Sequence, residues 1–211
     1  MKVVIFGASG ATGQHLVQKA LDQDHEVTAF VRSRGKLALQ HPRLTIIEGN
    51  VKDHDIVHKA ITGQHAVLSA LGASSIFKLD QLIIDGMANI LDAMASCAVR
   101  RLVYLSTLGV EESRRSAGFM IRNLAPTIIR NEIKGHELRE IMIRKSESSW
   151  TIVRAPILTN GPFTGKYRCG ESLKSDSFMT SLSRADVADL MLLQLTDQRF
   201  KRKSISLMPS N

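Results

Sequence analysis

The sequence predicts an α/β fold: a doubly wound parallel sheet with helices on both faces. The apolar segment at residues 3–6 is short and uninterrupted, as in strands that are buried on both faces of a parallel sheet. Segments of this kind alternate along the chain with segments of helical periodicity. A length of 211 residues suits one domain with a substantial core. We therefore expect a single domain over residues 1–211.

The expected elements follow from these two kinds of pattern. Short apolar segments predict strands at residues 3–6, 26–31, 44–48, 66–70, 102–105, 151–153 and 204–207. Apolar residues spaced three or four apart predict helices at residues 14–21, 55–62, 80–99, 126–145 and from 183 onward. Ser183 and Asp186 are candidate caps of the last helix. Residues 158–183, rich in Gly, Ser and Thr, are expected to form a small C-terminal substrate region, and residues 111–117 a mobile loop or lid.

Gly7, Gly10 and Gly13 separate the first expected strand from the first expected helix. Glycine adopts positive φ and has no Cβ, so a ligand can approach the backbone closely. The unpaired amides that open a helix, together with its dipole, attract phosphate. The spacing Gly-x-x-Gly-x-x-Gly differs from the Gly-x-Gly-x-x-Gly dinucleotide fingerprint, but the strand–turn–helix context agrees with it. This turn predicts a site for the pyrophosphate of a dinucleotide.

The residues after the second strand indicate which dinucleotide is bound. An acidic residue there accepts hydrogen bonds from the ribose of NAD, whereas an arginine accommodates the 2′-phosphate of NADP. This chain has Arg32, Ser33, Arg34 and Lys36 at that place and no acid. A guanidinium forms charge-assisted bonds to a phosphate that a carboxylate would repel. We therefore predict NADPH as the cofactor, although a basic surface loop would show the same residues.

The ligand crevice of an open parallel sheet lies beyond the carboxyl ends of its strands. The residues that follow the strands are therefore the expected cofactor contacts, with Asn50 placed to meet the adenine edge. Residues 102–105 deliver Ser106 and Thr107 to the same rim, near the expected nicotinamide, and these two are the candidate catalytic residues. The expected cofactor contacts are Gly7, Ser9, Gly10, Ala11, Thr12, Gly13, Arg32, Ser33, Arg34, Lys36, Asn50, Val51, Ala70, Leu71, Gly72, Ser106, Pro156, Ile157 and Leu158.

Composition argues against several other classes of protein. The net charge is +8, but aromatic residues do not interleave with the basic ones, so base-stacking platforms for nucleic acid are not expected. No apolar segment approaches the roughly 20 residues of a membrane span, and no signal peptide is recognisable. A cytoplasmic protein, monomeric or weakly dimeric, is therefore expected. Cys97 and Cys169 lack metal-site spacing, and no metal is expected.

Taken together, the motifs resemble the atypical short-chain dehydrogenases/reductases over nearly the whole chain. The segments that carry the resemblance are residues 7–13, 30–32, 49–51, 102–107, 151–156 and 184–188. Length and layout are most similar to the branch that includes biliverdin reductase B, also called flavin reductase. The resemblance implies a Rossmann-like fold, NADPH, and hydride transfer to a flavin, a linear tetrapyrrole or a quinone-like acceptor.

The chain departs from the family in its catalytic residues. The parent family uses a Tyr-x-x-x-Lys pair, in which the tyrosine protonates the substrate oxygen. Here Tyr104 is followed four residues later by Leu108, and Tyr167 by Glu171, so neither tyrosine can have that role. A flavin accepts hydride at nitrogen and takes its proton from solvent, so a flavin or quinone reductase tolerates this absence best.

The resemblance also places three further residues. Thr107 occupies the position of the active-site serine, with Ser106 before it as a cofactor contact, although a local backbone hydrogen bond is an equally simple role for Thr107. His136 lies near the position of the family lysine and is a candidate cofactor contact, the simpler alternative being a solvent-exposed helix residue. Ile157 stands where biliverdin reductase B has a histidine.

Two functions of different classes remain open. The first is an NADPH-dependent reductase of flavin, quinone-like or tetrapyrrole acceptors, which works mainly by holding two rings in contact. The second is a non-catalytic NADP(H)-sensing regulator of the NmrA-like type, since the missing tyrosine and lysine fit that as well. A sugar-nucleotide epimerase is disfavoured, because its chemistry needs the absent tyrosine.

Overall fold

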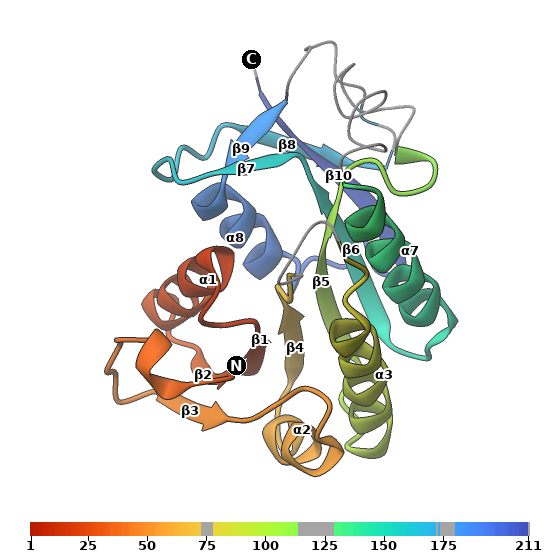
Figure 1. Cartoon of the computed structure of the whole chain (residues 1–211). Helices are drawn as coiled ribbons and strands as arrows, with labels where there is room; N and C mark the ends of the chain where they lie inside the picture. The colour runs from red at the N-terminus through yellow and green to blue at the C-terminus, as the bar shows by residue number, and fades with distance from the viewer. Residues whose placement is uncertain (73–77, 114–128, 172, 174–179, 211) are drawn as a thin grey trace.

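The computed structural model describes residues 1–72, 78–113, 129–171, 173 and 180–210. An eight-stranded sheet with the order β3-β2-β1-β4-β5-β6-β10-β8 forms its centre (Figure 1). Neighbouring strands are parallel except for β8, which is antiparallel to β10. The strands are β1 (Lys2–Phe6), β2 (Glu26–Val31), β3 (Leu44–Glu48), β4 (Ala66–Ser69), β5 (Arg101–Thr107), β6 (Ser149–Ala155), β8 (Tyr167–Gly170) and β10 (Lys203–Pro209). This confirms the predicted doubly wound α/β fold.

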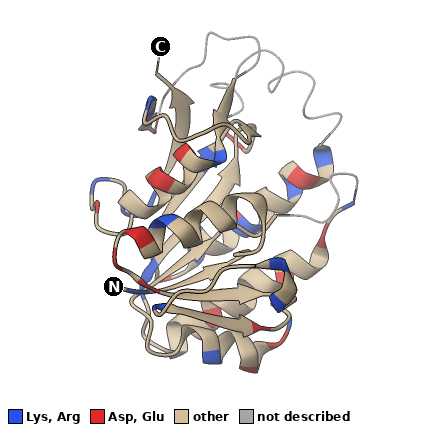
Figure 2. Ribbon diagram, turned by 90° about the vertical axis from the view of Figure 1, so that its left-hand side faces the viewer, with Lys and Arg blue, Asp and Glu red and all other residues tan. Residues whose placement is uncertain are grey.

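Helices cover both faces of the sheet. The described helices are α1 (Ala11–Asp22), α2 (His54–Ile61), α3 (Gln81–Ser96), α7 (Arg130–Lys145) and α8 (Arg184–Leu193), with a 3₁₀ turn, η1 (Arg34–Lys36). Helices α1 and α8 pack together on one face, and α2, α3 and α7 cover the other (Figure 1). Figure 2 shows Lys and Arg interspersed with Asp and Glu on the α1 side of the molecule. None of the described helices is long and apolar enough to cross a membrane.

The first strand explains why its sequence is apolar without interruption. Val3 and Ile5 point into the core beneath α1 and α8, whereas Val4 and Phe6 point into the core beneath α2 and α3. All four side chains are fully buried. A strand between two helical layers has no solvent face, so hydrophobic burial favours apolar residues at every position.

The described part of residues 158–183, which leaves out residues 172 and 174–179, contains more regular structure than expected. Strands β7 (Ile157–Thr159) and β9 (Ser181–Ser183) pair in parallel as a small second sheet, and β8 extends the edge of the main sheet. These strands have three or four residues, which is too short for a clear alternation of apolar and polar side chains. The predicted cap is confirmed: the Ser183 hydroxyl accepts a hydrogen bond from the amide of Asp186 at 3.0 Å. Of the expected lid at residues 111–117, residues 114–117 lie outside the described part of the chain.

Candidate functional site

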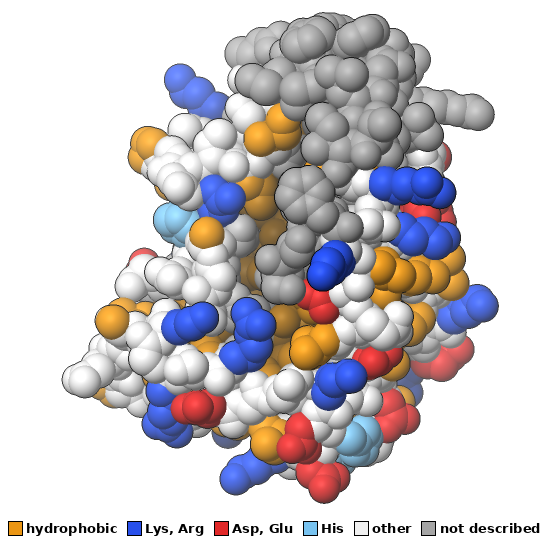
Figure 3. Space-filling view, in the orientation of Figure 1, with side chains coloured by type: hydrophobic (Ala, Val, Ile, Leu, Met, Phe, Trp, Pro, Cys, Tyr) orange, Lys and Arg blue, Asp and Glu red, His pale blue; other side chains and the backbone are white. Residues whose placement is uncertain are grey.

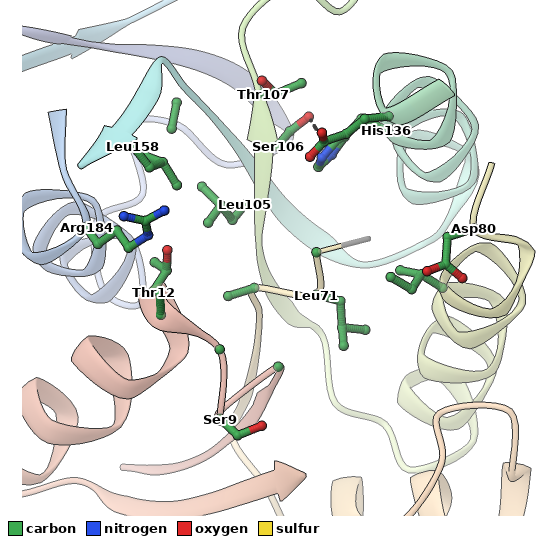
Figure 4. Close-up of a pocket in the computed structure, with 18 of the residues that line it drawn as sticks. Ser9, Thr12, Leu71, Asp80, Leu105, Ser106, Thr107, His136, Leu158 and Arg184 are labelled. Carbon is green, nitrogen blue, oxygen red and sulfur yellow. Dashed lines mark hydrogen bonds between the residues drawn. The ribbon is translucent and has the colours of Figure 1, made fainter. Parts of the chain in front are cut away.

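A cavity of about 990 Å³ lies at the carboxyl ends of the central strands. Figure 3 shows hydrophobic side chains at the bottom of this hollow, and Figure 4 shows its walls. The volume is at the upper end of the range for ligand sites in proteins. The lining residues come from most of the strand ends: Gly7, Ser9, Gly10, Ala11, Thr12, Phe30, Val31, Arg32, Lys36, Val51, Ala70, Leu71, Gly72, Asp80, Leu82, Ile83, Leu105, Ser106, Thr107, Leu108, Ile129, Glu132, His136, Ala155, Pro156, Ile157, Leu158 and Arg184.

The glycine turn forms one end of the cavity, and its glycines have different roles. Gly7 has a φ of 78°, and a Cβ there would lie 2.6 Å from the carbonyl oxygen of Ala70. Gly10 is the N-cap of α1 and offers no side chain to the first amides of the helix, which are therefore open to an anion. Gly13 does not line the cavity; a Cβ at this position would overlap the carbonyl oxygen of Gly7. The structure therefore gives Gly13 a packing role and does not bring it to the cavity wall, where its motif predicted a ligand contact.

The four predicted contacts in the basic segment after β2 also differ in their positions. Arg32 and Lys36 line the cavity, whereas Ser33 and Arg34 do not. The guanidinium of Arg34 instead donates a hydrogen bond to the carbonyl oxygen of Ile46 at 2.9 Å. Only two of the four predicted contacts are thus placed to meet a ligand in this cavity.

Asn50 is also placed differently from the prediction. It is exposed and does not line the cavity. Its side-chain oxygen accepts a hydrogen bond from the amide of Lys52 at 3.0 Å, which is a local turn interaction. The neighbouring Val51, together with Ala70, Leu71 and Gly72, lines the cavity as expected.

His136 lies at the opposite end of the cavity, and it is not a solvent-exposed helix residue, because only 6% of it is exposed. Its Nδ1 lies 2.7 Å from the Tyr104 hydroxyl. Burial lowers the pKa of His136 well below its ordinary value, and the charge of Arg139 lowers it further. Burial also raises the pKa of Tyr104, so that its hydroxyl stays protonated. The Tyr104 hydroxyl therefore donates to Nδ1, and the hydrogen of the neutral imidazole is on Nε2.

Ser106 lines the cavity and belongs to a buried hydrogen-bond network that extends away from it. Its hydroxyl donates a hydrogen bond to Oε1 of Glu140 at 2.6 Å. Arg154 donates to both carboxylate oxygens of Glu140, at 3.1 and 2.7 Å, and Arg144 donates to Oε2 at 2.8 Å. Because the hydroxyl hydrogen of Ser106 is bonded to Glu140, only its oxygen lone pairs remain for a ligand.

Thr107 lies beside Ser106 at the end of β5 and also lines the cavity (Figure 4). Its hydroxyl donates a long hydrogen bond of 3.3 Å to the carbonyl oxygen of Leu108. This local bond is the simpler role considered for Thr107, but its length leaves the hydroxyl freer than that of Ser106.

Three charged residues of the cavity were missed in the sequence: Asp80, Glu132 and Arg184. Arg184, at the start of α8, lies beside Thr12 and Leu158 in Figure 4, and its guanidinium donates to Oδ1 of Asn160 at 2.6 Å. Glu132 lines the cavity from the first turn of α7. Asp80 and Glu132 follow no strand, and Arg184 follows only the short strand β9, which was not predicted, so the search of predicted strand ends could not find them.

Most other lining residues at this end are apolar. They come from the segment after β4, from β5 and the residue after it, from the segment after β6, from α3 and from the residue before α7: Leu71, Leu82, Ile83, Leu105, Leu108, Ile129, Pro156, Ile157 and Leu158. A site with few polar groups among apolar walls suits a ligand with a flat, conjugated ring. Among the described residues, no group of three or more His, Cys, Asp or Glu could hold a metal ion.

Comparison with known proteins places the chain in a family. The sequence model for NAD(P)H-binding proteins matches residues 7–198. The chain is 30% identical over 115 residues to the photosystem II assembly factor Ycf39 of Synechocystis sp., a match that covers 53% of this chain and 35% of Ycf39. It is 24% identical over 213 residues to the uncharacterized sugar epimerase YhfK of Bacillus subtilis, covering 98% of this chain and 94% of YhfK. The chain thus spans only about a third of the length of Ycf39.

Solved structures show the same fold. A short-chain dehydrogenase/reductase of Veillonella parvula, in complex with NADP, has a TM-score of 0.83 and 22% identity, over 98% of this chain and 94% of that one. ChuY, an anaerobilin reductase of Escherichia coli O157:H7, has a TM-score of 0.80 and 19% identity, over 99% and 97%. With the family match over residues 7–198, we conclude that this chain belongs to the NAD(P)H-binding family and has the Rossmann-like fold of atypical short-chain dehydrogenases/reductases.

Proposed function

We propose that the protein is an NADPH-dependent reductase that transfers a hydride to a flat conjugated acceptor, such as a flavin, a quinone or a linear tetrapyrrole. The observation that carries this proposal is the composition of the cavity. One end has an uncapped helix N-terminus and two basic side chains, and the other has apolar walls around Ser106, Thr107 and His136. One cavity therefore suits a dinucleotide and a second ring next to each other.

The basic residues support NADPH over NADH. Arg32 and Lys36 line the cavity at the end of β2, where the adenosine ribose of a dinucleotide lies in this fold class. The two carboxyl groups among the described lining residues, Asp80 and Glu132, come from the α3 and α7 side instead. A 2′-phosphate would thus meet positive charge without a neighbouring carboxylate from the lining.

Each part of the site would contribute to the reaction by positioning the cofactor or the acceptor. When bound, NADPH supplies the hydride. The amides of Ala11 and Thr12 would hold its pyrophosphate, and Nε2–H of His136 can donate a hydrogen bond at the nicotinamide end. The apolar walls would exclude water and hold the acceptor ring in contact with the nicotinamide. Stacked, near-attack geometry would then account for most of the rate enhancement.

The test has two stages. NADPH and NADH are first titrated against the protein by fluorescence, and tighter binding of NADPH is expected. NADPH oxidation is then followed with FMN, FAD, biliverdin and a quinone series. The fold shared with ChuY is the reason for including tetrapyrroles. Binding of NADPH without oxidation by any acceptor would contradict the reductase and favour a non-catalytic NADP(H) sensor.

A further inference from the structure

We propose that Glu132 donates the proton that accompanies hydride transfer to the acceptor. This proposal rests on the proposed reductase function and supplies the acid that the missing Tyr-x-x-x-Lys pair leaves unassigned. The observations behind it are the position of Glu132 on α7, the charges around it, and the fact that the described residues give it no hydrogen bond or ion pair.

The position of Glu132 follows from helical geometry. Residues four apart in a helix lie on the same face, so Glu132 and His136 share one face of α7, and both line the cavity. His136 lies against Ser106 of β5, with Nδ1 and the serine Oγ 3.3 Å apart. Glu132 is one turn closer to the start of the helix. The carboxyl group thus lies in the acceptor end of the cavity, not at its phosphate end.

Glu132 differs from the other glutamates of α7 in its partners. Among the described residues it makes no hydrogen bond or ion pair, although it is half-buried. Glu140 is held by Ser106, Arg144 and Arg154, and Glu137 lies 3.5 Å from Lys134. A polar group that is removed from water without a partner is costly. A ligand in the cavity would provide the partner that the described part of the chain does not.

The charges around the Glu132 carboxyl group suit a general acid that is protonated before the reaction and ionised after it. Burial raises the pKa of the Glu132 carboxyl, and Arg139 partly offsets this. Tyr104 of β5, the neutral His136 and Asp80 before α3 also lie on this side, and Glu140, one of the charges that act on Tyr104, is held by Ser106, Arg144 and Arg154. Arg139 is 2% exposed, and its guanidinium is bonded to the carbonyl oxygens of Gly135 and Leu71, with no ion pair among the described residues. This charge would stabilise the carboxylate left after proton transfer.

The step balances as follows. The hydride of NADPH forms a new bond to the acceptor, and NADPH becomes NADP⁺. The electron pair of the reduced double bond moves to an oxygen or nitrogen of the acceptor. The O–H bond of Glu132 breaks and its proton goes to that atom. The carboxylate then takes a proton from water, so that the net reaction is NADPH, a proton and the acceptor giving NADP⁺ and the reduced acceptor.

The experiment compares Glu132→Gln with Glu137→Gln, a change on the same helix outside the cavity. NADPH affinity should be the same in both variants. The kcat for a quinone should fall roughly 10²-fold or more in Glu132→Gln, the scale of a positioned acid, and stay near wild type in Glu137→Gln. A flavin, which needs no immediate proton, should lose less. Glu132→Asp, which keeps the acid, should restore part of the rate.

The pH profile provides a readout that a purely structural role would not move. The wild-type rate with a quinone should fall as pH rises through the raised pKa of Glu132, and this fall should be absent in Glu132→Gln. A wild-type rate and profile in Glu132→Gln would overturn the proton donor while leaving the reductase intact. A wild-type protein that binds NADPH but reduces no acceptor would instead overturn the proposed function.

Discussion

The two ends of the cavity are built in different ways. The phosphate end comes from one continuous segment, in which β1, a glycine turn and α1 follow one another. The acceptor end is assembled from residues far apart in the chain: Tyr104 with His136, and Ser106 with Glu140. The first end therefore depends on local backbone conformation, whereas the second depends on a buried polar network. Mutations at the two ends should consequently reduce stability or binding for different physical reasons.

The largest effect is expected at the acceptor end. Glu140→Ala would remove the fully buried carboxylate that pairs with Arg154, which is 2% exposed, and with Arg144. Among the described residues, these arginines would keep only the more exposed Glu111 and Glu112 as ion-pair partners. Removing one side of a buried ion pair costs about 3–5 kcal/mol, and chemical denaturation should show a loss of this size. Glu137→Ala, which removes the surface pair with Lys134 on the same helix, should cost less than about 1 kcal/mol. Equal stability of the two variants would show that the network does not hold this end together.

The phosphate end should be most sensitive at Gly13. A Cβ there would overlap the backbone of Gly7, and overpacking typically costs about 1–3 kcal/mol, with the upper end expected where the clash is with backbone. Gly13→Ala should therefore destabilise the protein, although alanine in a helix interior ordinarily gains about 1 kcal/mol over glycine. Gly35→Ala is the control, because a Cβ at Gly35 meets nothing within 4 Å. Thermal denaturation of the two variants and the wild type measures this effect. A Gly13→Ala protein more stable than the wild type would contradict the close packing of the turn against the helix.

Arg32 tests the phosphate end by binding alone. Arg32→Ala should weaken NADPH by about 1.5–3 kcal/mol, the value of a hydrogen bond to a charged group, or roughly 10- to 100-fold. NADH, without the 2′-phosphate, should bind almost as before. Arg34→Ala removes a bond to Ile46 and should leave the ratio of the two affinities unchanged. Equal losses for NADPH and NADH in Arg32→Ala would remove the assignment of the 2′-phosphate.

The smallest effect concerns the pH dependence of stability. His136 has a folded-state pKa well below its ordinary value, so below about pH 6.5 the unfolded chain binds a proton there that the folded chain does not. Stability should therefore fall as pH decreases from about 6.5 toward the folded pKa, by at most about 1.4 kcal/mol per pH unit from this residue, with no contribution above that range. His136→Gln should flatten the slope in urea denaturation between pH 7 and 5. An unchanged slope, equal to that of the exposed His15→Gln, would place the acid sensitivity elsewhere.

Prediction from the sequence was most accurate where the signal is local. The seven predicted strands are all present, and the predicted range of β2 and of β3 coincides with the observed one. Burial on both faces explains the clear signal of the central strands such as β1, whereas β3 is a partly exposed edge strand. Prediction failed for side-chain direction. Arg32 and Arg34 are two residues apart in one basic segment, yet one lines the cavity and the other is bonded to β3. Residue type and spacing could not predict which arginine faces the cavity, because the bond of Arg34 is to Ile46 on the neighbouring strand β3.

The sequence by itself determined the alternation of strands and helices, the glycine turn and the basic residues after β2, since each is a property of a few consecutive residues. Only the tertiary structure decided that His136 is buried and neutral, that the hydroxyl hydrogen of Ser106 is taken by Glu140, and that Glu132 and Arg184 reach the cavity. The physical reason is that burial, pKa and hydrogen-bond partners depend on which distant segments meet. In this chain those segments meet only in the folded protein, where α7 and α8 lie on opposite faces of the sheet that contains β5 and β6.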